Sequence, residues 1–316
     1  MTTIASRESE VLSAPPPLGW SKLPAAYAIP TVAPSLAEAE AYCRNLASSH
    51  YENFSVATWF LPKRLRQPFC NVYAYCRISD DLGDEVGDPA ASLQLLDQWQ
   101  GELDACYAGN PRHPVFVALA GTVRQFDIPK HEFSDLLAAF RQDQRIHRYP
   151  TFEDLLGYCV NSANPVGHLV LYLCGYRDTE KQKLSDFTCT ALQLANFWQD
   201  VSVDYESKSR IYLPLEDLKR FGVAEEDIAA RRNTEAFCRM MKFEVERAGD
   251  WFRQGEPLIG KVAKELAIDI ELFSRGGQEI LKAIEQQGYA VLGNRPSISK
   301  ARKLRLVARA VWGKLV

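Results

Sequence analysis

The chain has 316 residues, of which 47% are hydrophobic and 24% are charged, so a sizeable core can form in one large domain or in two. A formal net charge of −3 argues against a nucleic-acid-binding protein, because phosphate binding needs a basic excess. The eight cysteines show no CxxC spacing, and no run of 18 uncharged apolar residues could span a membrane. We therefore expect a soluble protein of the reducing cytoplasm.

The N-terminal segment, residues 1–33, is rich in proline and lacks apolar periodicity, so we expect a flexible or draped arm. It also lacks the apolar stretch of a secretory signal. Ser35 with Glu38 three residues later predicts a capping box that begins a helix running to about Ala47. A polar and aromatic connector, 48–55, follows this helix.

Further helices are predicted by apolar residues spaced three and four positions apart, separated by glycine and proline. The first of them begins at Leu61-Pro62 and is broken by Gly83, Gly87 and Pro89. The remaining predicted helices are 91–107, 115–126, 130–145, 151–174, 179–204, 216–221, 234–253 and 257–287. A polar loop is expected at 205–210.

Two of these helices contain residues that disturb a helix. Pro165 removes a backbone donor, so we expect the 151–174 helix to be kinked there and to form the wall of a cavity. The 257–287 helix can be interrupted at Gly276-Gly277. Because alternating strand patterns are absent, we expect one all-α domain over 34–290. A basic amphipathic tail, 291–316, follows, and both a solvated tail and contact with an anionic membrane surface are open.

Two acidic motifs carry the candidate chemistry. Asn196, Asp200 and Asp204 recur every four residues and therefore share one helix face, and Asp80 and Asp84 have the same spacing upstream. Carboxylates are hard oxygen ligands, and Mg²⁺ prefers one or two of them together with waters and substrate phosphates. If the two faces meet across a gap, they can hold a metal-bound diphosphate. A pair of solvated helix faces is the alternative.

Basic and aromatic residues flank both motifs. Arg77 precedes the first one, and Arg210 and Tyr212 follow the second. An arginine side chain can bind phosphate oxygens through two parallel hydrogen bonds. A prenyl chain would also need an apolar and aromatic wall. Phe197 and Trp198 fit either that wall or the core.

The segments 73–84 and 193–204, followed by Arg210-Ile211-Tyr212-Leu213-Pro214, resemble the squalene and phytoene synthase family. The resemblance extends over about 37–287. It implies an all-α isoprenoid synthase fold, a single helical bundle around a central active-site cavity, and two or three Mg²⁺ ions. The residues that it implies as catalytic metal ligands are Asp80, Asp84, Asp200 and Asp204, with Asn196 as a further ligand.

The resemblance also implies contacts to a prenyl diphosphate substrate, and the expected kink adds Asn164 to them. The predicted contact residues in this part of the chain are Tyr73, Arg77, Tyr158, Asn164, Gln193, Asn196, Arg210 and Tyr212. Three departures from the family pattern look like its bacterial hydroxysqualene synthase branch. They are the His50-Tyr51-Glu52-Asn53-Phe54 segment in place of a serine-rich one, Gln199 where phytoene-type members commonly carry arginine, and the sequence of segment 162–167.

This branch implies conversion of presqualene diphosphate to hydroxysqualene with release of diphosphate, in the squalene and hopanoid route of bacteria. A presqualene diphosphate synthase would act upstream and a flavoprotein reductase downstream, so no NADPH is expected. One alternative is a sister enzyme that condenses two farnesyl or two geranylgeranyl diphosphates. Another, of a different class, is a non-catalytic scaffold or assembly protein with the same fold.

The 50–54 segment, which departs from the family pattern, suggests which residues bind and activate water. His50, Tyr51, Asn53 and Phe54 are predicted to contact substrate, and Glu52 to position or deprotonate the attacking water. The motivation is that a carboxylate and an amide replace hydroxyl-bearing serines. Glu52 as a helix cap or ion-pair partner is an equally open alternative.

Overall fold

The computed structural model describes residues 23–49 and 62–299. These residues form helices and connecting loops, and no strand occurs among them, so the all-α prediction is confirmed. In chain order the elements are η2 Ala25–Tyr27, α1 Leu36–Ser49, α3 Lys63–Asp84, α4 Pro89–Ala108, α5 Pro114–Phe126, α6 His131–Asp143, α7 Phe152–Ser162, α8 Asn164–Leu173, α9 Thr179–Lys208, α10 Leu215–Phe221, α11 Glu225–Ala229, α12 Glu235–Gly255, η3 Glu256–Lys261 and α13 Lys264–Gln286.

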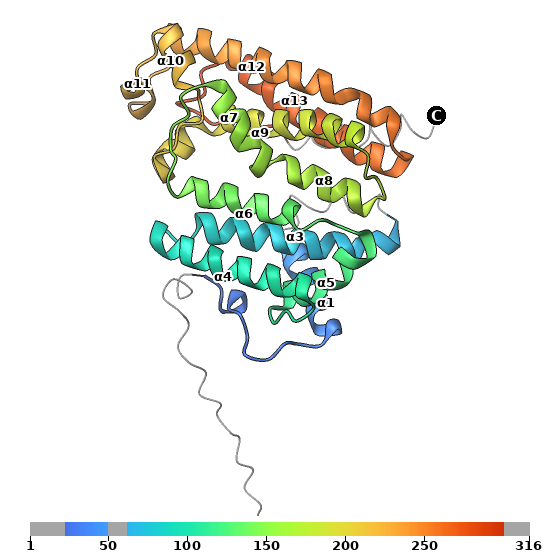
Figure 1. Ribbon diagram of the computed structural model, residues 1–316. Helices are drawn as coiled ribbons and strands as arrows, with labels where there is room; N and C mark the ends of the chain where they lie inside the picture. The colour runs from blue at the N-terminus through green and yellow to red at the C-terminus, as the bar shows by residue number, and fades with distance from the viewer. Residues whose placement is uncertain (1–22, 50–61, 300–316) are drawn as a thin grey trace, which may run out of the picture.

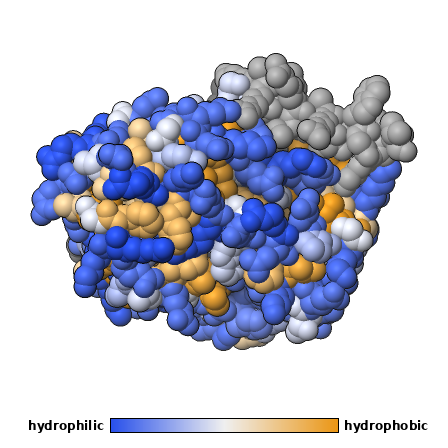
Figure 2. All heavy atoms as spheres, turned by 90° about the horizontal axis from the view of Figure 1, so that it is seen from above, coloured by the Kyte–Doolittle hydropathy of each residue, from blue (hydrophilic) through white to orange (hydrophobic). Residues whose placement is uncertain are grey.

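The helices stack in layers, with α12 and α13 at one side of the molecule and α1, α4 and α5 at the other (Figure 1). Helix α9 packs against α12, α13 and α8, and α3 packs against α1, α4, α5 and α6. Two apolar clusters result, one centred on α3 and the other on α9. Seen from the side of α12 and α13, the surface is largely polar with small apolar patches (Figure 2).

Side-chain caps fix several helix starts. The backbone N–H of Ser35 donates to Glu38 Oε2 at 2.9 Å, and the N–H of Glu38 donates to Ser35 Oγ at 3.4 Å, which confirms the predicted capping box. Thr151 and Asp154 form a second box at the start of α7. Asp178 caps α9 by accepting from the N–H of Lys181.

Helix α9 continues to Lys208, so the predicted loop at 205–210 is wrong for its first four residues. The extra turn is stabilised by tertiary contacts that the local polarity did not show. Lys208 forms an ion pair with Asp84 of α3, and the Tyr205 ring lies 6.0 Å from the guanidinium of Arg148. The helix ends at Ser209, whose φ of 51° is left-handed.

Glycines expected to break helices lie inside them. The predicted interruption at Gly276-Gly277 is wrong, because the break comes earlier, between η3 and α13. A Cβ at Gly277 would lie 2.4 Å from Phe252 Cζ, so the absence of a side chain lets α13 approach α12 closely. Gly83 remains within α3 and packs against the Phe140 ring.

The helix predicted over 151–174 is two helices, α7 and α8. The expected kink is a break of one residue at Ala163, whose φ of −119° departs from the usual helical value, and Pro165 occupies the first turn of α8, where no donor is lost. Helix α11 was not predicted at all, since its five residues are too short for a periodic pattern.

The ends of the described chain pack onto the helices. Leu23 and Tyr27 are buried, and so are Val291 and Leu292. The remainder of the predicted arm and tail, 1–22 and 300–316, lies outside the described residues. All eight cysteines are free, as their spacing predicted. Within the described ranges, no helix is both long and apolar enough to cross a membrane.

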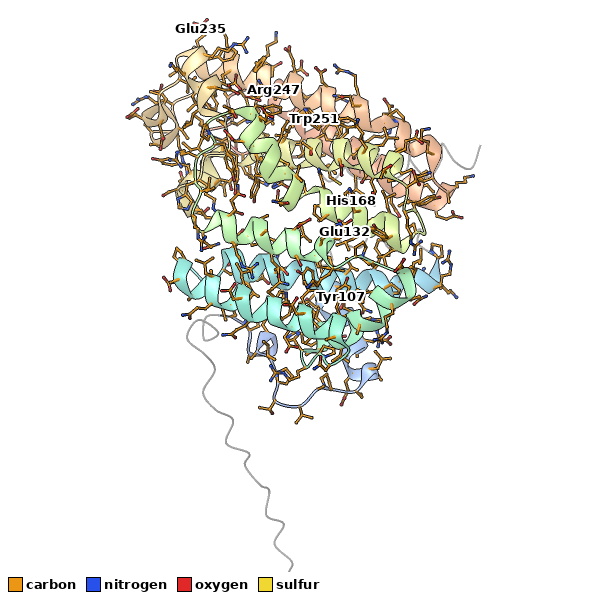
Figure 3. All side chains as sticks on the ribbon, in the orientation of Figure 1. Tyr107, Glu132, His168, Glu235, Arg247 and Trp251 are labelled. Atoms are coloured by element: carbon orange, nitrogen blue, oxygen red, sulfur yellow. The ribbon has the colours of Figure 1, made fainter. Side chains whose placement is uncertain are left out.

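A charged cluster joins three helices near the middle of the molecule. His168 on α8 faces Glu132 on α6 (Figure 3), with Nδ1 3.0 Å from Glu132 Oε2 and Nε2 2.7 Å from Asp186 Oδ1 on α9. Burial lowers the pKa of His168, but hydrogen bonds and charges from Asp186 and Glu132 outweigh this and raise the pKa to about 9. The imidazolium therefore ties α6, α8 and α9 together.

Replacing His168 with glutamine should destabilise the fold by about 2 kcal/mol near neutral pH, because buried Glu132 loses a charged partner. The folded-state pKa lies above the ordinary value, so the contribution is complete below about pH 6.5 and declines as the pH passes through about 9. Thermal unfolding at several pH values measures the difference in stability between the wild type and His168→Gln.

The matched control is His131→Gln, whose exposed ring also contacts Glu132. If the wild type is more stable than His168→Gln by the same amount at pH values below and above this window, the interpretation is wrong.

Candidate active site

The two acidic motifs lie on α3 and α9. Asp80 and Asp84, which we call the α3 acidic pair, occupy the last two turns of α3. Asn196, Asp200 and Asp204, the α9 polar row, lie on three successive turns of α9, as their spacing predicted. Asn196 is exposed and the four carboxylates are partly exposed. All five can therefore reach solvent or a ligand.

Basic residues at the end of α9 connect the two motifs. Lys208, one turn beyond Asp204, forms an ion pair with Asp84. Arg210 Nη1 donates to Asp84 Oδ1 at 3.1 Å. The negative charge of Asp84 also acts on Asp204. The structure thus brings the α3 acidic pair and the α9 polar row to the same site.

The carboxylates crowd negative charge in a partly desolvated place. Burial and then the charge of Asp84 raise the pKa of Asp80 to about 6. Burial and then the charge of Asp200 raise the pKa of Asp204 to about 7. Burial and like charge thus disfavour the ionised forms, and a divalent cation between the carboxylates would oppose both effects.

Some side chains of this site would have to change partners before a metal ion could bind. Among the described residues, no three His, Cys, Asp or Glu side chains converge as a ready-made metal centre. Asp84 is held by Lys208 and Arg210, and Arg295 binds Asp200 through two hydrogen bonds. The all-oxygen donor set fits Mg²⁺, which takes few protein ligands and fills its remaining positions with water and phosphate. The residues therefore suit a cation that binds together with a diphosphate.

Arg77 lies beside the α3 acidic pair but is engaged within its own helix. Its Nε donates to Asp81 Oδ2 at 3.1 Å, and Nη1 lies 3.7 Å from Asp80 Oδ2. Tyr27 also donates to Asp81, at 2.7 Å. The sequence analysis assigned no role to Asp81 or Tyr27, although the four-residue spacing of Arg77 and Asp81 is typical of an ion pair within a helix.

A buried carboxylate that the sequence did not reveal lies beneath the site. Asp143, at the end of α6, is 4% exposed and accepts from Tyr158 Oη at 2.7 Å and from Tyr212 Oη at 3.3 Å. Arg210 Nη2 donates to the backbone carbonyl of Asp143 at 3.1 Å. Burial raises the pKa of Asp143 to about 6, while Arg210 opposes the rise. Tyr158 and Tyr212 thus lie in a buried network behind the site, and Tyr212 stacks on Phe197 with 3.8 Å between ring centroids.

An apolar cavity adjoins the acidic motifs. It has two chambers, of about 290 Å³ between α8, α9 and α13 and about 210 Å³ between α3, α8 and α13. The residues shared by both linings are Val166, Val170, Leu266, Asp269 and Phe273. Tyr73 lines the smaller chamber, as predicted for a cavity wall.

The cavity and the acidic motifs occupy the same faces of two helices. On α3, Tyr73 and Cys76 line the cavity, and steps of four residues from Cys76 lead to Asp80 and Asp84. On α9, Ser185, Cys189 and Leu192 line the cavity, and one further turn leads to Asn196. Each helix therefore runs from an apolar wall to a polar end, which suits a molecule with a hydrocarbon chain and an anionic head.

The other predicted site residues have different surroundings. Asn164 is buried at the start of α8 and accepts from Thr190 Oγ1 at 3.1 Å. Gln193 is half-buried on α9. Gln199, one of the branch-specific residues, is buried and donates to the Pro296 carbonyl at 2.6 Å, which fixes the segment carrying Arg295. The predicted residues His50, Tyr51, Glu52, Asn53 and Phe54 lie outside the described residues.

Comparison with known proteins identifies the family. Residues 47–302 match the family described as squalene/phytoene synthase. The chain belongs to this family. The resemblance inferred from the paired motifs and the isoprenoid synthase fold is thereby confirmed.

Individual relatives support the same assignment. The 15-cis-phytoene synthase of Synechococcus elongatus is 30% identical over 282 residues, which cover 85% of this chain and 91% of the relative. That of a Synechocystis species is 31% identical over 290 residues, covering 87% and 86%. The structure of squalene synthase HpnC from Alicyclobacillus acidocaldarius is 46% identical with a TM-score of 0.77, and the match covers 80% of this chain and 95% of that one. A dehydrosqualene synthase structure is 27% identical with a TM-score of 0.80, covering 89% and 98%.

Proposed function

We propose that this enzyme of the squalene/phytoene synthase family converts presqualene diphosphate to hydroxysqualene in a Mg²⁺-dependent reaction. The observation that carries the proposal is the shared face of each helix, α3 and α9, which leads from the apolar cavity to the acidic motifs. The 46% identity to the structure called squalene synthase HpnC supports a squalene-type substrate. The branch-specific Gln199, fixed in the fold by its contact with Pro296, also supports it.

Different residues of the protein would bind the diphosphate and the hydrocarbon part of the substrate. Arg210 and Lys208 offer hydrogen bonds and positive charge to the diphosphate, and Arg77 lies at its other side. Mg²⁺ held by the four aspartates of the two motifs with Asn196 would neutralise the leaving diphosphate. The apolar chambers would hold the hydrocarbon and exclude bulk water. Since the product is an alcohol, no hydride from NADPH is needed.

A sister reaction has specific support. The phytoene synthases at 30% and 31% identity favour condensation of two prenyl diphosphates. The same fold and metal chemistry serve both reactions, so the substrate decides between them. A non-catalytic scaffold is disfavoured by the retained carboxylates of the α3 acidic pair and the α9 polar row.

The test is to incubate the purified protein and Mg²⁺ separately with presqualene diphosphate, farnesyl diphosphate and geranylgeranyl diphosphate, and to identify the lipid products by mass spectrometry. Hydroxysqualene from presqualene diphosphate, without product from the other two substrates, supports the proposal. Product from farnesyl or geranylgeranyl diphosphate supports the sister reaction instead. No product from any of the three supports the scaffold.

Glu52→Gln gives a second test, based on the sequence alone. If Glu52 positions or deprotonates the attacking water, the variant should make on the order of 10²-fold less hydroxysqualene, while diphosphate release changes little. Both quantities can be measured in one reaction, with Glu246→Gln, an exposed carboxylate on α12 that pairs with Lys242, as the control. An unchanged yield of hydroxysqualene would leave Glu52 without this role.

We further propose that an upstream presqualene diphosphate synthase supplies the substrate and that a downstream flavoprotein reductase removes the hydroxyl group. Both steps follow from the chemistry of the proposed substrate and product. The predicted cytoplasmic location, with contact between the basic tail and the inner membrane, would suit transfer of so apolar a product.

A further inference from the structure

The larger apolar chamber follows α9 in the direction away from the acidic motifs. Its lining on this helix extends from Leu192 back to Ser185. Ser185 and Asn196 are eleven residues apart, so a rise of about 1.5 Å per residue separates them by about 16 Å along the helix axis. A hydrocarbon chain whose anionic head binds at the acidic motifs therefore has a limited length of wall beside it.

Helix α8 runs antiparallel to α9 along the same chamber. At its start Asn164 accepts from Thr190 Oγ1 at 3.1 Å, and near its end Tyr172 Oη accepts from Gln182 Nε2 at 3.3 Å. Leu171, next to Tyr172, is 1% exposed and lines the chamber. It therefore lies at the end of the chamber that is farthest from the acidic motifs.

The short helix η3 reaches the same end of the chamber. Gly255, directly before η3, packs against α9, where a Cβ would lie 2.9 Å from the backbone nitrogen of Thr188 and 3.1 Å from the carbonyl oxygen of Leu184. The absence of a side chain at Gly255 thus lets η3 approach α9 closely. Leu258 of η3 is 1% exposed and also lines the chamber. We call Leu171 and Leu258 the end wall.

We propose that the end wall limits each hydrocarbon chain in this cavity to the length of a farnesyl group, an inference that rests on the proposed function. An extended farnesyl chain, with twelve backbone carbons, is about 14 Å long, because each C–C bond of about 1.5 Å advances a zigzag by about 1.25 Å. A geranylgeranyl chain, with sixteen, is about 19 Å long by the same measure. The shorter chain fits between Asn196 and the end wall, whereas the last isoprene unit of the longer one meets Leu171 and Leu258.

This limit bears on the choice between the two reactions considered above. Presqualene diphosphate is built from two farnesyl groups, so its long arm is no longer than a farnesyl chain. Condensation of two geranylgeranyl diphosphates would need room for the longer chain. The end wall therefore selects the squalene-type substrate, and Leu258 is a specificity-determining residue.

The test measures binding of farnesyl and geranylgeranyl thiodiphosphates by calorimetry in the presence of Mg²⁺. Sulfur replaces the bridging oxygen in both compounds, so that the bond to carbon resists ionisation. The wild type should bind the farnesyl compound at least about tenfold more tightly, and Leu258→Ala, which opens space beyond the end wall, should bind both with affinities within about threefold. Leu192→Ala, the same substitution at the chamber end nearest the acidic motifs, should weaken both and keep the preference.

A wild type that binds the two compounds equally, or binds neither, overturns the proposal. So does a preference that survives in Leu258→Ala or is lost in Leu192→Ala. If Leu258→Ala does not fold, a crystal structure of the wild type with farnesyl thiodiphosphate decides instead. The last isoprene unit should lie within about 4.5 Å of Leu171 or Leu258, and any other position rejects the limit.

Failure of this inference can be distinguished from failure of the proposed function, because the binding measurements involve no turnover. A wild type that makes hydroxysqualene but binds both chains equally would refute the role of the end wall alone. A wild type that prefers the farnesyl chain but makes no hydroxysqualene would refute the proposed function alone.

Discussion

Asp80→Asn and Asp200→Asn should each lower turnover by on the order of 10²- to 10³-fold, with little change in substrate binding to the cavity. Each substitution removes a charge from one of the two acidic motifs, and metal-assisted departure of a diphosphate depends on several kcal/mol of charge stabilisation. Initial rates at saturating Mg²⁺ and substrate measure the loss. Rates near those of the wild type in either variant would reject the model in which the two motifs act together.

The same variants should fold as well as the wild type. Asp80 and Asp200 are partly exposed, so asparagine leaves no cavity. The raised pKa of Asp80 shows that its charge is unfavourable in the fold, and Asp80→Asn should therefore unfold at an equal or slightly higher temperature. Asp104→Asn, an exposed carboxylate on α4 paired with Lys130, is the control for loss of a charge elsewhere. Circular dichroism with thermal unfolding separates lost activity from lost structure.

The sequence predicted those parts of the site that follow from local periodicity. Because residues four apart lie on one helix face, the alignment of Asn196, Asp200 and Asp204 could be predicted without tertiary information. The pairing of the α3 and α9 motifs came from the family resemblance. Most helices were likewise predicted to within a few residues of their ends.

The buried network could not be predicted, because its members are distant in sequence. Asp143 meets Tyr158 fifteen residues later, and its contacts with Arg210 and Tyr212 span 67 and 69 residues. Nothing in the helix pattern around Asp143 distinguishes it from a carboxylate at a solvated helix end.

Arg210→Met should be the most destabilising of the substitutions considered, at about 3–5 kcal/mol. Arg210 is 6% exposed and its guanidinium contacts both the backbone and the carboxylate region of Asp143, as well as Asp84. Its removal leaves Asp143 buried without its positively charged partner, and the remaining side-chain contacts of Asp143 are those with the two tyrosine hydroxyls. Denaturant unfolding of the purified variant measures the loss of free energy.

A second substitution determines whether Asp143 is the cause. Arg210→Met combined with Asp143→Asn should recover about half of the lost stability or more, because a neutral amide needs no positively charged partner while the tyrosine hydrogen bonds can persist. Arg231→Met, which removes an exposed ion pair with Glu206, should cost less than about 1 kcal/mol. If the double variant is no more stable than Arg210→Met, the penalty comes from lost packing or from Asp84. Arg210 would then stabilise the fold through those contacts and not by neutralising Asp143.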